Sequence, residues 1–275
     1  MENRLEELAK RFGNIENSLN QLQQQLNGIS KKKSEQVTTS LSSSSTTITT
    51  SESSSSALAS TIIENPNAII HESNFDREEP NDTELIKIVK KQVQKLGFKF
   101  ANFSQVPKDY YSRPLEARRD LLQTASMHQL CKSLILENSK CVLSDCSVRT
   151  NSKYYCVIVQ YSAKFNSKKL TKYVRELNQG KLGKKQFVFS LTDAPKAFEL
   201  TGYEFNGVSP VALPEKENIN IPIVLDKKIV DEHKQFWIGG GSEDWKILFN
   251  TDEFIKIYNP FVTSITYEGN EIDEE

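Results

Sequence analysis

Apolar residues at the start of the chain recur at alternating spacings of three and four, which is the period of a coiled-coil helix. The seam spans four heptads and consists of Leu5, Leu8, Phe12, Ile15, Leu19, Leu22, Leu26 and Ile29. This pattern predicts a coiled-coil helix over residues 1–30. A lone helix would leave its apolar stripe in water, so we expect a partner helix to cover residues 5–29. The simplest partner is a second copy in a parallel homodimer, and the alternative is a helix of another protein.

The heptad pattern is lost after residue 30. Lys31, Lys32 and Lys33 lead into a Ser/Thr-rich run that continues through Ser60 with only scattered apolar residues. Such a composition buries too little apolar surface to offset the entropy of ordering the chain. We therefore interpret residues 31–82 as a disordered linker, residues 83–265 as the folded domain and residues 266–275 as an acidic tail.

Helical and strand patterns alternate through the folded domain. Periodic apolar positions with capping residues predict helices at 83–97, 166–178, 193–200 and 251–258, together with a short helix that begins at Asp226. We expect Asp82 or Thr83 to cap the first of these, and Thr192 and Thr251 to cap two later ones. Runs of β-branched and aromatic residues predict strands at 98–103, 130–136, 154–161, 187–191, 221–225, 235–238 and 245–249.

Charge is unevenly distributed along a nearly neutral chain. The formal net charge is −1 over 275 residues, yet residues 140–190 hold eleven Lys/Arg and two acids. A basic stretch of this kind either meets a polyanion partner or forms a solvated lysine face, and the pattern leaves both interpretations open.

The four cysteines and the start of the chain bear on compartment and metal binding. The cysteines, at positions 131, 141, 146 and 156, lack the close Cys-x-x-Cys pair that is typical of zinc sites. Two of them lie in strand-like runs, so buried reduced thiols are the better interpretation. The chain opens with a charged helical pattern, and no apolar stretch approaches the ~20 residues that span a bilayer. We expect a cytoplasmic protein with no membrane contact.

Residues 200–210, with the sequence LTGYEFNGVSP, turn the backbone sharply between a helical segment and an apolar run. Gly207 has no Cβ, so a ligand can approach its main chain closely. Pro210 restricts its own φ and favours an extended Ser209. The amides of Gly207, Val208 and Ser209 are therefore expected to converge on one oxygen atom, which is how backbone polarises a carbonyl.

This stretch resembles the signature of the YbaK / prolyl-tRNA synthetase-associated editing domains. The resemblance covers roughly residues 84–261 and rests on Thr201–Tyr203 with Gly207–Pro210, Ile221–Asp226, Gly239–Gly241, Trp245–Phe249 and Leu130–Ile135. It implies an α+β fold with a mixed, strongly twisted, barrel-like β-sheet flanked by helices. It also implies a substrate, an amino acid esterified to the 3′ end of tRNA.

Lys132 is unusual within the strand-like run 130–136. The strand pattern alone favours a lysine that points outward, whereas the resemblance places the functional lysine of the family at this position. The run of three glycines is not a phosphate-binding loop, because no Gly-Lys-Ser/Thr follows it. It is either a tight turn or a place where the backbone approaches a ligand.

The composition disfavours other chemistries. The chain has three histidines, Ser209 lacks the Gly-x-Ser-x-Gly elbow, and no paired carboxylates, metal fingerprint or cofactor fingerprint stand out. A site of backbone amides and one lysine is sufficient for an activated ester, which needs an oriented water and a stabilised oxyanion. We expect no cofactor, catalytic roles for Lys132 and Gly207, and substrate contacts from Ser133, Asn206, Val208, Ser209, Pro210, Gly239, Gly240 and Gly241.

Two departures from the family pattern bear on function. Asn206 stands where the family commonly has glycine, and we expect its side chain to intrude on the pocket. The Ser-Gly-Gly-Lys/Arg of the family becomes Gly239–Asp244, which is acidic. The first hypothesis is a trans-editing aminoacyl-tRNA deacylase. The second is a non-catalytic module that binds tRNA or an aminoacyl-tRNA synthetase through its fold and coiled coil, and a third is a coiled-coil adaptor for other proteins.

Overall fold

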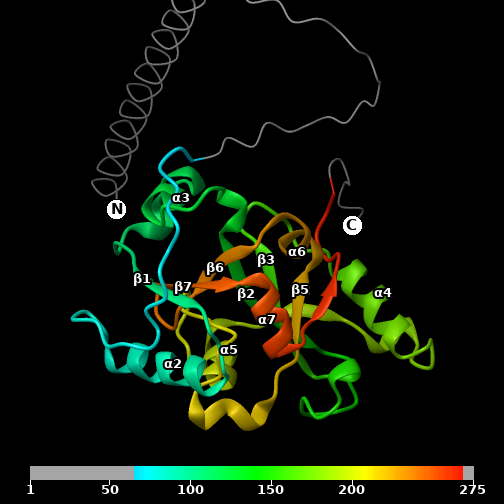
Figure 1. Ribbon diagram of the computed structural model, residues 1–275. Coiled ribbons are helices and arrows are strands. Elements are labelled where there is room, and N and C mark those ends of the chain that lie inside the picture. Colours follow the sequence, from blue (N-terminus) through cyan, green and yellow to red (C-terminus); the bar gives the residue numbers. More distant parts are fainter. Residues whose placement is uncertain (1–64, 269–275) are drawn as a thin grey trace, which may run out of the picture. The chain divides into compact units, whose positions relative to one another are not determined.

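The computed structural model describes residues 65–268, whose arrangement is shown in Figure 1. The helices are α2 (Glu84–Lys95), α3 (Leu115–Leu121), α4 (Ser167–Leu177), α5 (Ala194–Thr201), α6 (Lys227–Glu232) and α7 (Thr251–Tyr258). The strands are β1 (Ala101–Gln105), β2 (Cys131–Asn138), β3 (Tyr154–Gln160), β4 (Phe189–Leu191), β5 (Ile223–Asp226), β6 (Gln235–Gly239), β7 (Trp245–Asn250) and β8 (Phe261–Thr263). The predicted coiled-coil helix, the linker up to residue 64 and residues 269–275 of the tail lie outside this range.

The strands form two sheets. A three-stranded antiparallel sheet has the order β1-β7-β6, and a five-stranded sheet has the order β4-β2-β3-β5-β8. In the larger sheet β2 runs antiparallel to β3 and β4, whereas β5 runs parallel to β3 and β8. A parallel bridge between Leu130 and Trp237 connects the two sheets. The fold is therefore mixed α+β, with twisted sheets flanked by helices, as the sequence predicts.

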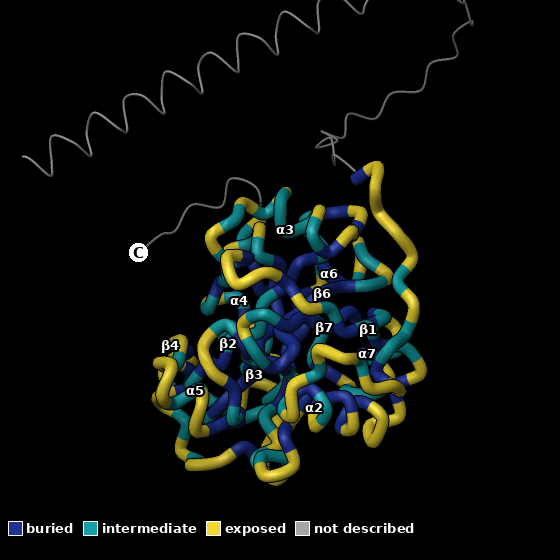
Figure 2. Tube along the Cα trace, turned by 90° about the vertical axis from the view of Figure 1, so that its left-hand side faces the viewer, coloured by how far each residue is buried: buried dark blue, intermediate teal, exposed yellow. Residues whose placement is uncertain are grey.

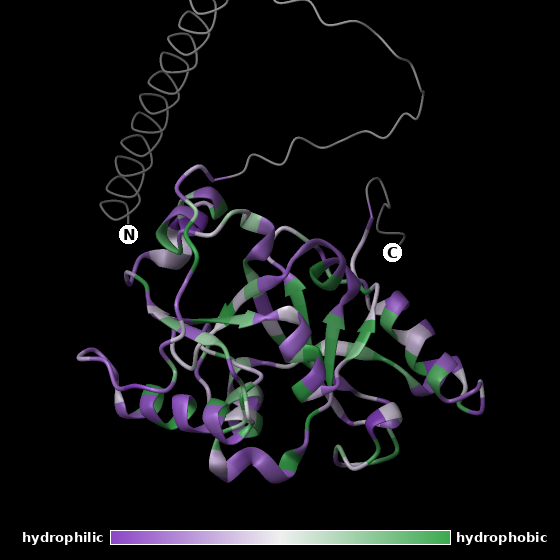
Figure 3. Ribbon diagram, in the orientation of Figure 1, coloured by the Kyte–Doolittle hydropathy of each residue, from purple (hydrophilic) through white to green (hydrophobic). Residues whose placement is uncertain are grey.

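Strand β3 lies at the centre of the core because both of its faces are covered. All of its residues are buried, and alternate side chains enter different apolar clusters. Cys156 and Ile158 join the cluster that includes α2, α6 and α7, while Tyr155 and Val157 join the cluster that includes Leu170 of α4. Figure 2 shows the buried strands enclosed by exposed outer segments, and Figure 3 shows hydrophobic strands beside a largely hydrophilic α2.

Two of the predicted helix caps are wrong, because each threonine hydroxyl has another acceptor. The Thr192 hydroxyl donates to the Ile135 carbonyl at 2.9 Å, and Asp193 caps α5 instead. Thr251 is the first residue of α7, and its hydroxyl donates to the carbonyl of His233, so Asn250 caps that helix. In both cases a neighbouring residue, Asp193 after Thr192 and Asn250 before Thr251, supplies the side-chain oxygen that accepts from the first turn of the helix.

Residues 65–82, interpreted from composition as the end of the linker, lie against the domain. Phe75 is buried in the main core cluster, and the amide of Asn74 donates to the Ala101 carbonyl at 3.1 Å beside β1. At the start of this segment the Asn65 amide donates to the Ala125 carbonyl. One aromatic residue and several asparagines supply contacts that a Ser/Thr-rich chain lacks, so the folded part extends back to residue 65. Among residues 65–268 no helix is long and apolar enough to cross a membrane.

Lys90 and Asp82 form a buried ion pair under the first turns of α2. Their side chains are 4% and 0% exposed, and the Lys90 ammonium lies 2.7 Å from a carboxylate oxygen of Asp82. The ammonium also donates to the Arg77 carbonyl at 3.0 Å. Thr83 caps α2 as predicted, which leaves the Asp82 carboxylate available for this lysine.

We expect Lys90→Ala to lower the free energy of unfolding by about 3–5 kcal/mol, because the Asp82 carboxylate would stay buried without its countercharge. Urea unfolding at neutral pH measures the change. Lys227→Ala removes the exposed pair with Asp231 and is the matched control, with an expected change below about 1 kcal/mol. Equal effects of the two substitutions would contradict a structural role for the buried pair.

Candidate functional site

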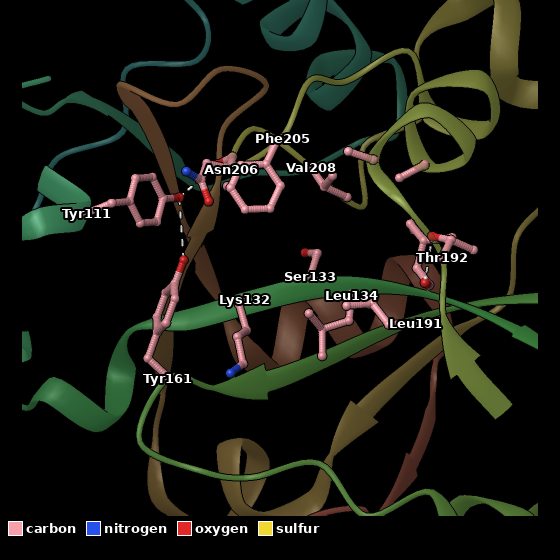
Figure 4. A pocket seen from close by; sticks show the side chains of 14 residues that line it. Tyr111, Lys132, Ser133, Leu134, Tyr161, Leu191, Thr192, Phe205, Asn206 and Val208 are labelled. Atoms are coloured by element: carbon pink, nitrogen blue, oxygen red, sulfur yellow. Dashed lines mark hydrogen bonds between the residues drawn. The ribbon is translucent and has the colours of Figure 1, made fainter. Parts of the chain in front are cut away.

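The main cavity of the domain lies along the open edge of β2 and measures about 440 Å³. Residues 131–134 of β2 pair with β3 on one side only, because β4 pairs with residues 136–138 and the Thr192 amide donates to the Ile135 carbonyl. The free edge faces α5, the end of β6 and the loop that follows α5. The cavity is lined by Tyr111, Lys132, Ser133, Leu134, Ile135, Tyr161, Leu191, Thr192, Ala194, Ala197, Phe205, Asn206, Val208 and Gly239 (Figure 4).

The structure brings together half of the residues that the sequence nominates for the site. Lys132, Ser133, Asn206, Val208 and Gly239 line this cavity. The other five do not: Ser209 and Pro210 line a second cavity of about 190 Å³, and Gly207, Gly240 and Gly241 line neither.

Lys132 lies at the cavity with its ammonium turned away from the loop. Figure 4 shows the side chain pointing away from Asn206 and Val208, and its Nζ lies 5.7 Å from the centre of the Tyr161 ring. Half-burial lowers the pKa of this ammonium below that of an ordinary lysine. Among residues 65–268 it has no hydrogen-bond or ion-pair partner, so its charge is available to a ligand.

Ser133 points to the opposite face of β2 from Lys132. Its hydroxyl is buried and has no hydrogen-bond partner within the described chain. Figure 4 shows this hydroxyl facing the loop across the cavity, toward Phe205 and Val208. A buried hydroxyl without a partner costs free energy unless a ligand or water completes its hydrogen bonds, which makes Ser133 a candidate substrate contact.

Of the three backbone amides predicted to be free for a ligand, those of Gly207, Val208 and Ser209, one has an acceptor within the loop. The Gly207 amide donates to the Glu204 carbonyl at 3.0 Å, which closes a tight turn. The amides of Val208 and Ser209 have no acceptor in the described part of the chain. A backbone donor for a substrate oxygen at this loop would therefore come from Val208, which lines the cavity, and not from Gly207.

The glycines of the site allow two backbone segments to pack directly on each other. A Cβ on Gly207 would lie 2.7 Å from the Gly241 carbonyl oxygen, and a Cβ on Gly239 would overlap the Val208 carbonyl oxygen. The Gly241 amide donates to the Gly207 carbonyl at 3.1 Å. Gly240 bonds to Trp245 in the turn between β6 and β7. The run of glycines is thus a tight turn seated against the loop, and only Gly239 reaches the cavity.

A closed ring of hydrogen bonds holds Asn206. The Tyr111 hydroxyl donates to the Asn206 carbonyl at 2.8 Å, and the Lys246 ammonium donates to the Tyr111 hydroxyl at 3.1 Å. Lys246 also donates to the Glu243 carbonyl at 2.7 Å, and the Asn206 side-chain amide donates to the Glu243 carboxylate at 2.8 Å. Asn206 has φ of 65°, a left-handed conformation that asparagine tolerates. The two departures expected to disturb the pocket, Asn206 and the acidic turn, therefore bind each other.

Comparisons with known proteins agree with this fold. A family model described as the aminoacyl-tRNA editing domain matches residues 118–257, which is half of the chain. The chain belongs to the aminoacyl-tRNA editing domain family. Among solved structures, a proposed trans-editing enzyme for prolyl tRNA synthetase is similar, with 17% identity, a TM-score of 0.53 and coverage of 68% of this chain and 100% of that chain. A scaffold protein from computational epitope backbone grafting matches at 17% identity and a TM-score of 0.52, with the same coverage. A search of curated proteins finds no match.

Lys246, which lies behind the candidate site, was not nominated by the sequence analysis. It is 3% exposed, and its ammonium lies over the rings of Tyr110 and Tyr111, 5.0 and 4.7 Å from their centres. Burial lowers its pKa to about 7, against the opposing charges of Asp244 and Glu243. The signal in the sequence is a lysine inside an apolar strand, the same signal that drew attention to Lys132.

A second cation stabilises the tyrosines at this end of the editing domain's cavity. The Arg118 guanidinium lies 5.4 Å from the ring centres of Tyr110 and Tyr111 and 5.5 Å from that of Tyr161. It donates to the carbonyls of Tyr111 and Arg113. Tyr111 lines the cavity, whereas Tyr110 is buried. Within the described residues no three His, Cys, Asp or Glu side chains are grouped to hold a metal, and Cys131 and Cys156 are buried free thiols as predicted.

We expect Gly239→Ala to destabilise the editing domain by about 1–3 kcal/mol, because the new methyl group forces β6 away from the loop. Thermal and urea unfolding measure the loss. Gly183→Ala is the matched control, since its Cβ would meet no atom closer than 4.0 Å, and its stability should be nearly unchanged. A fully stable Gly239→Ala protein would show that the loop and the turn are not in direct contact.

Lys246 should make stability depend on pH. Its folded pKa of about 7 lies below the ~10.4 of an unfolded lysine, so between these values the unfolded chain holds a proton that the folded domain has released. The free energy of unfolding of the wild type should therefore rise between pH 7 and 8.5, by up to about 1.4 kcal/mol per pH unit, relative to Lys246→Met. Urea unfolding across this range measures the slope. Lys227→Met should keep the wild-type slope, and identical slopes for wild type and Lys246→Met would refute the lowered pKa.

Proposed function

We propose that the domain is a trans-editing deacylase that hydrolyses the ester of mischarged aminoacyl-tRNA. The family membership supports the substrate class. The single observation that carries the proposal is the pair Lys132 and Ser133 at the main cavity. Within residues 65–268 the ammonium and the buried hydroxyl have no hydrogen-bond partner, and they lie on opposite faces of one open strand edge. Such a site binds an anionic, ester-bearing chain end without an acid–base pair of side chains.

In the proposed reaction a water oxygen attacks the ester carbonyl carbon, and the carbonyl π electrons move onto oxygen. The Val208 amide and the Ser133 hydroxyl donate hydrogen bonds to this oxyanion. Collapse of the intermediate breaks the bond to the ribose oxygen, which takes up a proton from the attacking water. The products are a free amino acid and a tRNA with its terminal hydroxyl restored. The adjacent ribose hydroxyl helps to position the water.

Lys132 is assigned to the negative charge of the substrate rather than to proton transfer. Its ammonium faces away from Val208, a position that suits the terminal phosphate better than the oxyanion. Contact with the oxyanion would require the four-carbon side chain to change rotamer.

The proposed partners follow from charge and from the N-terminal heptads. Lys172 on α4 and Lys181, Lys184 and Lys185 after it are exposed, and such a surface suits the phosphates of tRNA. Residues 5–29 would pair either with a second copy of this chain or with a helix of another protein. An aminoacyl-tRNA synthetase is the candidate for that other protein. The proposed compartment is the cytoplasm.

A specific observation favours a second candidate, a non-catalytic module that binds tRNA or a synthetase. The Gly207 amide is occupied by Glu204, and the Glu243 carboxylate stands beside the cavity on Asn206. Both features weaken anion stabilisation at the loop while leaving the fold and the basic surface intact.

A panel of mischarged tRNAs distinguishes the two candidates. We expect hydrolysis of at least one of them well above the spontaneous rate, and Lys132→Met should lower that rate by about 10-fold or more, as for the loss of one hydrogen bond to a charged group of the substrate. Lys132→Arg keeps the charge and should retain part of the rate, and Lys227→Met should behave as wild type. Binding of tRNA without hydrolysis of any panel member would favour the non-catalytic module.

The same assay has a pH signature. Burial lowers the pKa of the Lys132 ammonium, so its charge is lost at a lower pH than that of an ordinary lysine. The rate above background should fall on the alkaline side for the wild type and persist to higher pH for Lys132→Arg, because arginine stays protonated. Parallel profiles would remove Lys132 from the reaction.

A further inference from the structure

Phe205 is an aromatic side chain held in water at the mouth of the cavity. It is 74% exposed and yet lines the same cavity as Ser133 and Val208. Figure 4 shows its ring beside Asn206, across the cavity from Ser133. Leu191, 64% exposed, lines the cavity as well. An exposed apolar rim around a polar centre is typical of a binding site and not of a solvated surface.

The loop presents this ring rigidly. Phe205 and Asn206 are the two central residues of the turn closed by the bond from the Gly207 amide to the Glu204 carbonyl. Asn206 is fixed by Tyr111 through its carbonyl and by Glu243 through its side chain. The backbone under Phe205 is therefore ordered before any ligand arrives, which lowers the entropy cost of using the ring as a contact.

We propose that Phe205 is the stacking platform for the nucleobase at the 3′ end of the RNA substrate. The inference rests on the proposed function and adds the residue that binds the base. The ester and the base are attached to the same ribose, so an ester held at Ser133 and Val208 keeps the base at the cavity mouth. There the base needs an apolar surface for its face and water for its polar edges, and the exposed ring of Phe205 provides both.

This contact would select for the presence of a base more than for its identity. Stacking on an aromatic ring tolerates every base, because each has a π face. No side chain with a free hydrogen-bonding group is needed at Phe205 for such binding. An RNA end that lacks its terminal base should therefore bind poorly, whereas a change of the terminal base should matter little.

Binding of a non-hydrolysable RNA hairpin tests the proposal. The hairpin carries an amide-linked amino acid and 2-aminopurine as its terminal base, whose fluorescence changes when it stacks. We expect Phe205→Ala to weaken binding by roughly fivefold or more and to abolish the fluorescence change, and Phe205→Trp to retain both. Phe198→Ala is the matched control, since Phe198 is 51% exposed on α5 and does not line the cavity, and it should bind as wild type.

A second hairpin without the terminal base separates the alternatives. If Phe205 contacts the base, wild type and Phe205→Ala should bind this hairpin equally weakly. A penalty for Phe205→Ala that persists without the base would assign the ring to the amino acid and overturn the proposal. Wild-type binding that does not depend on Phe205 with either hairpin would overturn the stacking role alone. Absence of RNA binding by the wild type would overturn the proposed function and this inference with it.

Discussion

The left-handed conformation of Asn206 is the constraint on which the candidate site depends. Its φ of 65° is maintained by a ring of hydrogen bonds through Tyr111, Lys246 and Glu243. The ring joins three segments that are distant in the chain, the turn before α3, the loop after α5 and the turn before β7. A change at any member is therefore felt at the cavity, although Lys246 is buried and lines no part of it. The ring also explains why an asparagine and an acidic turn occur together here, since each supplies the partner that the other needs.

The cavity exists because one strand is only partly paired. β4 covers the last residues of β2 and leaves residues 131–134 with a free edge. Successive side chains of this segment point to opposite faces of the sheet, as in any strand. Lys132 and Ser133 therefore line the same cavity from opposite faces of β2. Lys132 contributes a positive charge and Ser133 contributes a hydroxyl. The backbone packing of Gly239 on Val208 closes the far end. In the described part of the chain, the polar groups that face this cavity include a lysine ammonium and a serine hydroxyl without hydrogen-bond partners, held on a backbone that is fixed by packing.

The helices and strands were predicted from the sequence more accurately than the hydrogen bonds and pKa values of individual residues. Strand and helix periods follow from local burial, so the fold class and most elements agree with the structure, including the cap at Thr83 and a short helix at Asp226. The caps at Thr192 and Thr251 failed because distant carbonyls compete for their hydroxyls. The Gly207 amide was assigned to a ligand because the sequence did not show that a local turn places the Glu204 carbonyl against it. Lys246 was missed because the burial that lowers its pKa comes from residues far away in the chain.

The order of strands in the larger sheet has a consequence for folding during synthesis. β5 is flanked by β3 and β8, both parallel to it, and β8 is followed by residues that bond back to the start of α4, where the Asn166 amide donates to the Ile265 carbonyl. Pairing across such sequence separations is slow, because the intervening chain must first be closed into loops. The sheet cannot be completed until almost the whole domain has left the ribosome. Until then β5 exposes an apolar edge, so the nascent chain passes through a stage at which chaperone protection matters most.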